Sequence, residues 1–275
     1  MNSTLFGTSA ILAYIASAVV MFRSLRPAYE AVPDAAAVQR FKVLAVGWFA
    51  AALHAMAMIN LYAGEGGLDF SLLNALSAIT WIIVAIVLVA ALFRPLDKLG
   101  LVVFPLAAVI LALKLSVPEG SHRLHEHSWP MAVHIVVSVL AYGFLNIAAI
   151  QAVLLAFQDW SLRSHHRGGL LIRSLPPLET MEAVLFQLIG AGFTLLSLSL
   201  VTGFLFLENM FAQHLAHKTI LSLLAWILFA VLLAGRFRSG WRGPTAIRWT
   251  LGGFFALMLA YLGSKMVLEW ILKRA

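Results

Sequence analysis

Three histidines stand in long apolar stretches of this 275-residue chain: His54, His134 and His217. Polar groups are costly inside a membrane span, so they are candidates for function wherever such a stretch crosses a bilayer. A neutral imidazole can ligate a transition-metal ion, or it can form a hydrogen bond to a neighbouring helix. Sequence alone leaves both interpretations open for each of the three.

A polar stripe follows His134 along the apolar segment in which it lies. The stripe consists of four residues spaced four apart, namely His134, Ser138, Tyr142 and Asn146. Residues with this spacing share one slowly drifting face of a helix. In lipid, such a face must turn toward other helices or toward a cavity, and the stripe alone does not identify a ligand.

A short polar segment before Trp129 carries alternating histidines and carboxylates. Imidazole and carboxylate groups at such spacings can bind a divalent metal such as zinc. The pattern is common in polar loops, so these histidines are only weak candidates for a metal site. They are His122, His125 and His127, with Glu119 and Glu126 beside them.

The composition indicates which solvent surrounds these residues. Hydrophobic residues make up 62% of the chain and charged residues 11%, whereas a soluble domain carries about 25% charge. A membrane span needs about 20 apolar residues, which must be helical because the runs do not alternate with period two. We expect an all-α integral membrane protein, one domain over 1–275 with about eight transmembrane helices. The expected spans are 5–22, 43–62, 71–93, 99–116, 131–157, 182–207, 217–235 and 249–270.

The placement of the basic residues predicts the orientation. Of 19 Lys and Arg residues, 13 lie in the gaps after the first, third, fifth and seventh spans. Basic residues concentrate on the cytoplasmic side, so both termini are expected outside, in a bacterial inner membrane. The net charge of +7 is explained by this bias and by attraction to anionic lipid, without nucleic acid. The chain has no cysteine, so covalent haem attachment, thiolate metal sites and disulfides are excluded.

With this topology, His54, His134 and His217 all fall in the outer half of the membrane, on three different helices. Helix bundles hold haem through histidines on facing helices. Without cysteines the group would be a noncovalent haem b. Trp129 offers an aromatic ring at the same mouth, and Lys218 and Arg123 offer cations for the propionates.

Four later segments carry a resemblance to a known family. They are HIVVSVLAYGFLNIAAIQAVLLAFQ (134–158), PPLETMEAVLFQLIGAGFTLLSLSLVTG (176–203), HKTILSLLAWILFAVLLAGR (217–236) and GWRGPTAIRWTLGGFFALMLAYLGSK (240–265). Together they resemble the CcsA-like cytochrome c assembly proteins, and most closely the YpjD subgroup, with HemX-type relatives. The early pieces LHAMAM and LLNALSAITW are similar as well.

The resemblance implies a haem-handling bundle in which external histidines flank a tryptophan-rich WWD segment. It places His134 at the first external histidine, His54 at a histidine of an early helix, and Lys218 at the lysine of the WDPKET stretch. The chain departs from the pattern because no Trp lies between 161 and 225, LAHKTI replaces WDPKET, and the second external histidine is absent. A complete synthase is therefore not expected. We expect His217 or His54 to be the second axial partner of His134.

Several functions remain open. A haem-handling membrane protein is the first, and a non-enzymatic accessory or regulatory subunit of another membrane complex, such as a transporter, is the alternative. A small-substrate permease is disfavoured by the few charges within the spans. Enzymatic turnover is not expected, because the chain shows no acid–base or nucleophile constellation.

Two carboxylates, Glu179 and Glu182, follow Pro176 and Pro177 at the start of the sixth span. Carboxylates in a first helical turn complement the positive end of the helix dipole. Helix capping is therefore a sufficient explanation for both.

Overall fold

The computed structural model describes residues 2–25, 33–65, 68–69, 71–93, 97–117, 123–124, 129–164, 169–206 and 216–263. These residues are nearly all helical and form two compact units, each with its own packing. Unit 1 comprises 1–125 and 168–176, and unit 2 comprises 126–167 and 177–275. The expectation of a single domain stays a prediction, and the units are described one at a time.

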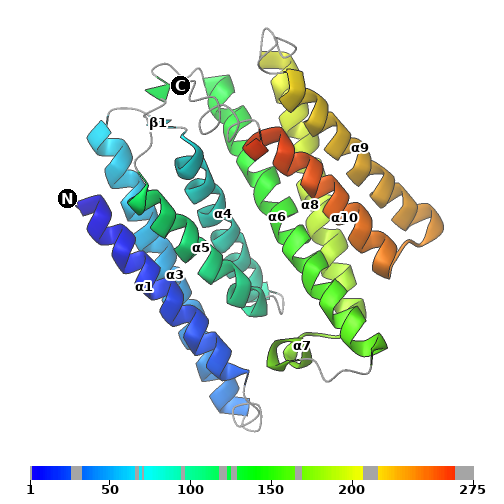
Figure 1. Ribbon diagram of the computed structural model, residues 1–275, viewed down its shortest axis with the longest axis horizontal. Coiled ribbons are helices and arrows are strands. Elements are labelled where there is room, and N and C mark those ends of the chain that lie inside the picture. The colour runs from blue at the N-terminus through cyan, green and yellow to red at the C-terminus, as the bar shows by residue number, and fades with distance from the viewer. Residues whose placement is uncertain are drawn as a thin grey trace. The chain divides into compact units, whose positions relative to one another are not determined.

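Unit 1 is built on four helices that lie side by side (Figure 1): α1 (Asn2–Ser24), α3 (Pro33–Glu65), α4 (Leu72–Phe93) and α5 (Gly100–Ser116). Helix α1 packs on α3 and α5, and α4 packs on α5 and α3. The 3₁₀ turn η1 (Asp97–Leu99) leads into α5, and the short helix α7 (Leu170–Ser174) also belongs to this unit. Two-residue strands β1 (Leu68–Asp69) and β2 (Arg123–Leu124) pair antiparallel.

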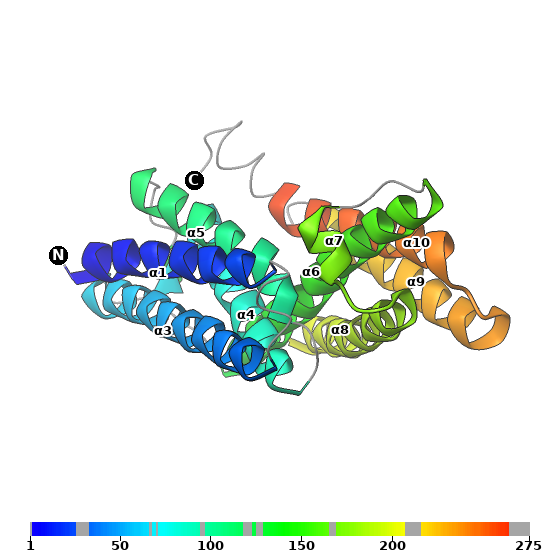
Figure 2. The ribbon, with the colours of Figure 1, turned by 90° about the horizontal axis from the view of Figure 1, so that it is seen from below.

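Unit 2 contains α6 (Trp129–Arg163), α8 (Leu178–Phe206), α9 (Ala216–Ser239) and α10 (Gly243–Met258), and α10 continues as the π-helical turn η2 (Leu259–Gly263). Helix α6 packs along α8 and also contacts α10, while α9 packs on α10 and α8 (Figure 2). The approach of α6 to α8 is close at Gly192, where an added Cβ would lie 2.7 Å from Leu145. Glycine fits there because an added Cβ would meet the side chain of Leu145, which would have to shift.

Seven helices of the described chain are long and apolar enough to cross a membrane. Their spans are Ser3–Ser24, Val38–Asn60, Leu72–Phe93, Asp97–Ser116, Trp129–Arg163, Leu178–Phe206 and His217–Ser239. They match the first seven expected spans and confirm an all-α integral membrane bundle. The eighth expected span, 249–270, is described as α10 and η2, and the rest of it lies outside the described residues.

The distribution of side chains agrees with lipid as the solvent. Large apolar side chains are exposed on the outer faces of the helices, among them Leu12, Phe49 and Phe255. Polar side chains such as His54 and Ser77 are instead fully buried. Because lipid does not penalise exposed apolar surface but does penalise unpaired polar groups, this arrangement is stable only in a bilayer. The orientation of the termini stays a prediction.

Candidate functional site

His54 lies at the centre of a buried three-helix contact in unit 1. Its Nδ1 is 3.3 Å from the hydroxyl oxygen of Tyr14 on α1, and its Nε2 is 2.8 Å from Oγ of Ser77 on α4. His54, Tyr14 and Ser77 all have an exposed fraction of 0%. The imidazole on α3 therefore ties α3 to both α1 and α4.

The aromatic surroundings of His54 restrict the ring further. The Tyr14 ring meets it edge-on at a centroid distance of 5.9 Å and stacks on Phe104 of α5 at 6.0 Å. Both ring nitrogens of His54 are thus engaged in hydrogen bonds, and the ring is enclosed by apolar atoms. This geometry is that of a histidine that forms hydrogen bonds to neighbouring helices, rather than that of a metal ligand.

His134 has a different environment on α6 of unit 2. Its Nδ1 is 3.1 Å from the backbone carbonyl oxygen of Ser199 and 3.1 Å from Oγ1 of Thr202, both on α8. The side chain is only partly buried, and no hydrogen bond joins its Nε2 to any residue in the described ranges. One ring nitrogen is therefore held and the other has no protein partner among them.

The partners of His134 determine where its proton lies. A backbone carbonyl only accepts hydrogen bonds, so the contact with Ser199 requires Nδ1 to carry the hydrogen. The hydroxyl of Thr202 lies 2.9 and 3.0 Å from the carbonyl oxygens of Leu198 and Ser199 and can donate its one hydrogen to either, so toward His134 it can accept. The contact with Ser199 assigns the Nδ1–H tautomer of the neutral ring, and the contact with Thr202 is compatible with it. The lone pair on Nε2 is then available to a ligand.

The rest of the polar stripe also makes hydrogen bonds within the unit, as its spacing of four predicted. Ser138 donates from Oγ to the carbonyl of His134 at 2.6 Å and lies 2.7 Å from Oγ of Ser199. Tyr142 donates to the carbonyl of Leu257 on α10 at 3.0 Å. Asn146 donates to the carbonyl of Tyr142 at 2.8 Å. The stripe therefore faces α8 and α10. In the described residues, Nε2 of His134 is left without a hydrogen bond.

Three other expected site residues lie near the ends of the same helices. Trp129 begins α6, is 74% exposed, and has its ring centroid 6.3 Å from that of Phe206 at the end of α8. His217 and Lys218 lie in the first turn of α9, which begins at the end of unit 2 where α8 finishes (Figure 1). His217 is exposed, and no hydrogen bond or ring contact between it and His134 exists within the described ranges.

Other predicted groups fall outside what the structure describes. The weak metal candidates His122, His125 and His127 lie outside the described residues, and the side chain of Arg123 is not described. In the described part of the chain, no three His, Asp or Glu side chains come together as a set that could hold a metal ion.

The residues that hold the two histidines were not predicted from the sequence. Ser199 and Thr202 lie in LSLSLVTG on α8, and Tyr14 and Ser77 lie in apolar runs of α1 and α4. Their one signal in the sequence was a hydroxyl within a membrane span, which is frequent and usually bonds to its own helix.

A comparison with known families adds to this geometry. Residues 43–272 match the sequence model of the family described as cytochrome C assembly protein. The chain belongs to the cytochrome c assembly protein family. The match includes His54, His134 and His217, as the resemblance of the apolar segments indicated.

Relatives in the family are similar over most of the chain. The inner membrane protein YpjD of Escherichia coli K12 is 33% identical over 209 residues, which cover 76% of this chain and 78% of the relative. Protein HemX of Brevibacillus brevis is 23% identical, over 70% of this chain and 72% of the relative. The cytochrome c biogenesis protein CcsA of Trieres chinensis is 26% identical, over 70% of this chain and 73% of the relative. No solved structure matches this cytochrome c assembly family member.

Proposed function

We propose that the chain is a haem-handling protein of the bacterial inner membrane and that His134 holds a noncovalent haem b. The observation that carries this proposal is the fixed tautomer of His134, whose Nδ1–H is held by the Ser199 carbonyl at 3.1 Å. A histidine that donates its other ring hydrogen to a backbone carbonyl has the orientation and basicity of a metal ligand. Family membership and relatives named as cytochrome c biogenesis proteins support the same function.

The fit of a haem to this end of unit 2 depends on residues with separate tasks. His134 would supply the axial nitrogen, and the exposed ring of Trp129 would cover part of an apolar macrocycle. Lys218 would offer a cation to a propionate. Bound haem supplies an iron that accepts axial ligands and can change oxidation state. Ser199 and Thr202 keep the His134 ring in one orientation, with its Nδ1 proton in place.

The second histidine that would hold the haem in this proposal is His217 rather than His54. His217 is exposed in the first turn of α9, while His54 is fully enclosed and uses both ring nitrogens in hydrogen bonds. An iron at His54 would require breaking the contact with Ser77 or Tyr14, and each leaves a buried polar group without a partner. We assign His54 to helix packing.

An absorption spectrum tests the proposal. The full chain, purified in mild detergent and reconstituted with haem, should show a Soret band. The band should be lost in His134→Ala, should change to a five-coordinate form in His217→Ala, and should persist in His54→Leu. Wild-type protein without a Soret band, or an unchanged band in His134→Ala, would overturn the assignment.

The alternative is a non-enzymatic accessory or regulatory subunit of another membrane complex, such as a transporter. The observation that favours it is that many polar side chains inside the helices are satisfied within the chain, as in the bond from Trp226 Nε1 to Ser197 Oγ at 2.8 Å. Such groups then serve only helix association. A partner that co-purifies with the chain, in a preparation without a chromophore, would support this function.

A further inference from the structure

The connection between α9 and α10 concentrates positive charge at one end of unit 2. Four arginines lie between residues 236 and 248, and we name this segment the arginine corner: Arg236, Arg238, Arg242 and Arg248. From 216 to 263 the sequence contains no Asp or Glu. Because the corner directly follows the span His217–Ser239, it lies at a membrane surface whichever way the protein is oriented.

The backbone of the arginine corner is held in a defined shape. Gly240 and Gly243 have φ angles of 65° and 52°, a region that side-chain-bearing residues rarely adopt. The amide of Trp241 donates to the carbonyl of Gly235 at 3.2 Å, and Nη1 of Arg236 donates to the carbonyl of Trp241 at 3.2 Å. The connection is therefore a built turn that ends α9 and starts α10.

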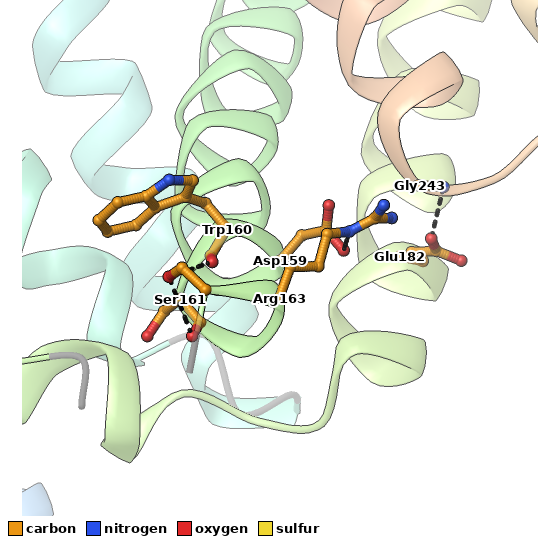
Figure 3. Close-up of polar contacts among 7 residues, drawn as sticks. Asp159, Trp160, Ser161, Arg163, Glu182 and Gly243 are labelled. Atoms are coloured by element: carbon orange, nitrogen blue, oxygen red, sulfur yellow. Dashed lines mark hydrogen bonds and ion pairs between the residues drawn. The ribbon is translucent and has the colours of Figure 1, made fainter. Parts of the chain in front are cut away.

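Two carboxylates of this unit already have partners. Glu182 on α8 accepts a hydrogen bond from the backbone amide of Gly243 at 2.6 Å, which caps the start of α10 (Figure 3). Asp159 on α6 pairs with Arg163 one turn later at 3.0 Å (Figure 3). Glu179 is exposed in the first turn of α8.

The outward arginines of the corner have no such partner. Arg238, Arg242 and Arg248 are exposed, and none forms an ion pair within the described residues. Arg236 differs, since its guanidinium lies 4.6 Å over the ring of Phe186. Arg238 lies in the last turn of α9, Arg242 in the connection and Arg248 in α10. Unpaired guanidinium groups such as these are suited to phosphate oxygens, which arginine binds in a bidentate manner.

Aromatic side chains surround the same turn. The rings of Trp241 and Trp249 are 5.5 Å apart, and Phe237 is 84% exposed on the last turn of α9. Tryptophan favours the level of the lipid headgroups, where one edge of its ring is apolar and the other is polar. A cationic surface with an exposed apolar side chain beside it matches a molecule that has both an anionic head and an apolar tail.

We propose that the arginine corner binds the headgroup phosphates of anionic phospholipids, with Phe237 against the acyl chains. The argument rests on charge complementarity and on the adjoining aromatic residues, and it is independent of haem binding. In the predicted orientation the corner faces the cytoplasm, where the leaflet carries anionic lipid.

Native mass spectrometry of the full chain tests this proposal. The protein, purified in a mild detergent, is titrated with cardiolipin and, separately, with phosphatidylcholine. We expect cardiolipin to bind preferentially. Each basic residue near a charged bilayer surface contributes about fivefold to affinity, so Arg238→Gln with Arg242→Gln should weaken cardiolipin binding about 30-fold. Arg238→Lys with Arg242→Lys retains both charges and should keep most of the binding.

The matched control removes two charges from unit 1, through Arg23→Gln with Lys42→Gln, whose side chains are both exposed. This control should bind cardiolipin as the wild type does. Equal weakening in the two double variants would mean that net charge alone attracts the lipid, and unchanged binding in the corner variant would exclude the site. Displacement of cardiolipin by millimolar glycerol phosphate would indicate a soluble anion instead, and would also overturn the proposal. If the corner double variant melts well below the wild type without lipid, Arg238→Gln and Arg242→Gln are tested singly, and each should weaken cardiolipin binding about fivefold.

Discussion

The hydrogen bond from His54 to Ser77 makes a quantitative prediction about the stability of unit 1. The contact is 2.8 Å long, and both residues have an exposed fraction of 0%. Ser77→Ala removes the hydroxyl and leaves Nε2 of His54 buried in an apolar environment without its partner. His54→Leu removes the imidazole and replaces it with a side chain of comparable volume.

Two ranges bracket the expected magnitude. Leaving a buried polar group without a partner costs about 1–3 kcal/mol in soluble proteins. Interhelical hydrogen bonds in membrane proteins average about 0.6 kcal/mol and reach about 1.7 kcal/mol. Because the His54–Ser77 bond is short and fully buried, its coupling energy should fall in the upper half of the membrane range, about 1–1.7 kcal/mol. The bond to Tyr14 is longer, at 3.3 Å, so Tyr14→Phe should couple more weakly to His54.

A double-mutant cycle measures this coupling. The two single variants and the double variant are unfolded in mild detergent, and the interaction energy is the departure from additivity. Thr8→Ala provides the control, because Thr8 is exposed on α1 and bonds to the carbonyls of Thr4 and Leu5 in its own helix. If His54 couples to Ser77 no more strongly than to Thr8, the assignment of His54 to helix packing is wrong.

Two further predictions concern the helix contacts of unit 2. Gly192→Ala places a Cβ within 2.7 Å of a buried leucine on α6 and should destabilise the α6–α8 contact by about 1–3 kcal/mol. The control is Gly190→Ala, where an added Cβ has nothing within 4 Å, and it should be neutral or slightly stabilising in thermal unfolding. Equal effects of the two variants would contradict the close approach. Glu182→Ala removes the carboxylate that accepts the first amide of α10, so that amide should exchange hydrogen faster and stability should fall by about 1–3 kcal/mol. The control is Glu179→Ala, because Glu179 is exposed in the first turn of α8, the helix that also carries Glu182. This variant should change stability by less than about 0.5 kcal/mol. Faster exchange of the Gly243 amide in it would argue against a specific role for Glu182.

Hydropathy predicted the helical type and seven of the eight expected spans, but not the ends of the helices. The second expected span, 43–62, lies within a helix that runs from Pro33 to Glu65, and the span 131–157 lies within Trp129–Arg163. Apolar runs identify the part of a helix that lipid surrounds. The helix itself continues into water, where its backbone hydrogen bonds remain favourable, so its true length exceeds the apolar run.

The residue types of the site could be predicted, but their partners could not. A histidine within an apolar run is visible in the sequence, and a spacing of four indicates which side chains share its face. The identity of the facing helix depends on tertiary packing, which no periodicity specifies. Thus Ser199 and Thr202 could not be assigned to His134 in advance, although all three lie in segments that were recognised.

Glu182 illustrates the same limit in a capping residue. Its place shortly after Pro177 predicted that it would complement the dipole of its own helix. The structure instead shows its carboxylate accepting the amide of Gly243 at the start of α10. A carboxylate near the start of a helix can accept a hydrogen bond from any free amide within reach, and here that amide begins another helix.

His54 and His134 show how the facing helix determines what an imidazole can do. His54 meets two hydroxyl groups, which can each donate or accept, so both of its nitrogens are satisfied and neither is left for a ligand. His134 meets a backbone carbonyl, which only accepts, so its proton is held on Nδ1 and the lone pair of Nε2 is left without a partner in the described protein. The residue type is the same in both places. We therefore propose ligand binding at His134 from the hydrogen-bonding capacity of α8, and a packing role for His54 from that of α1 and α4.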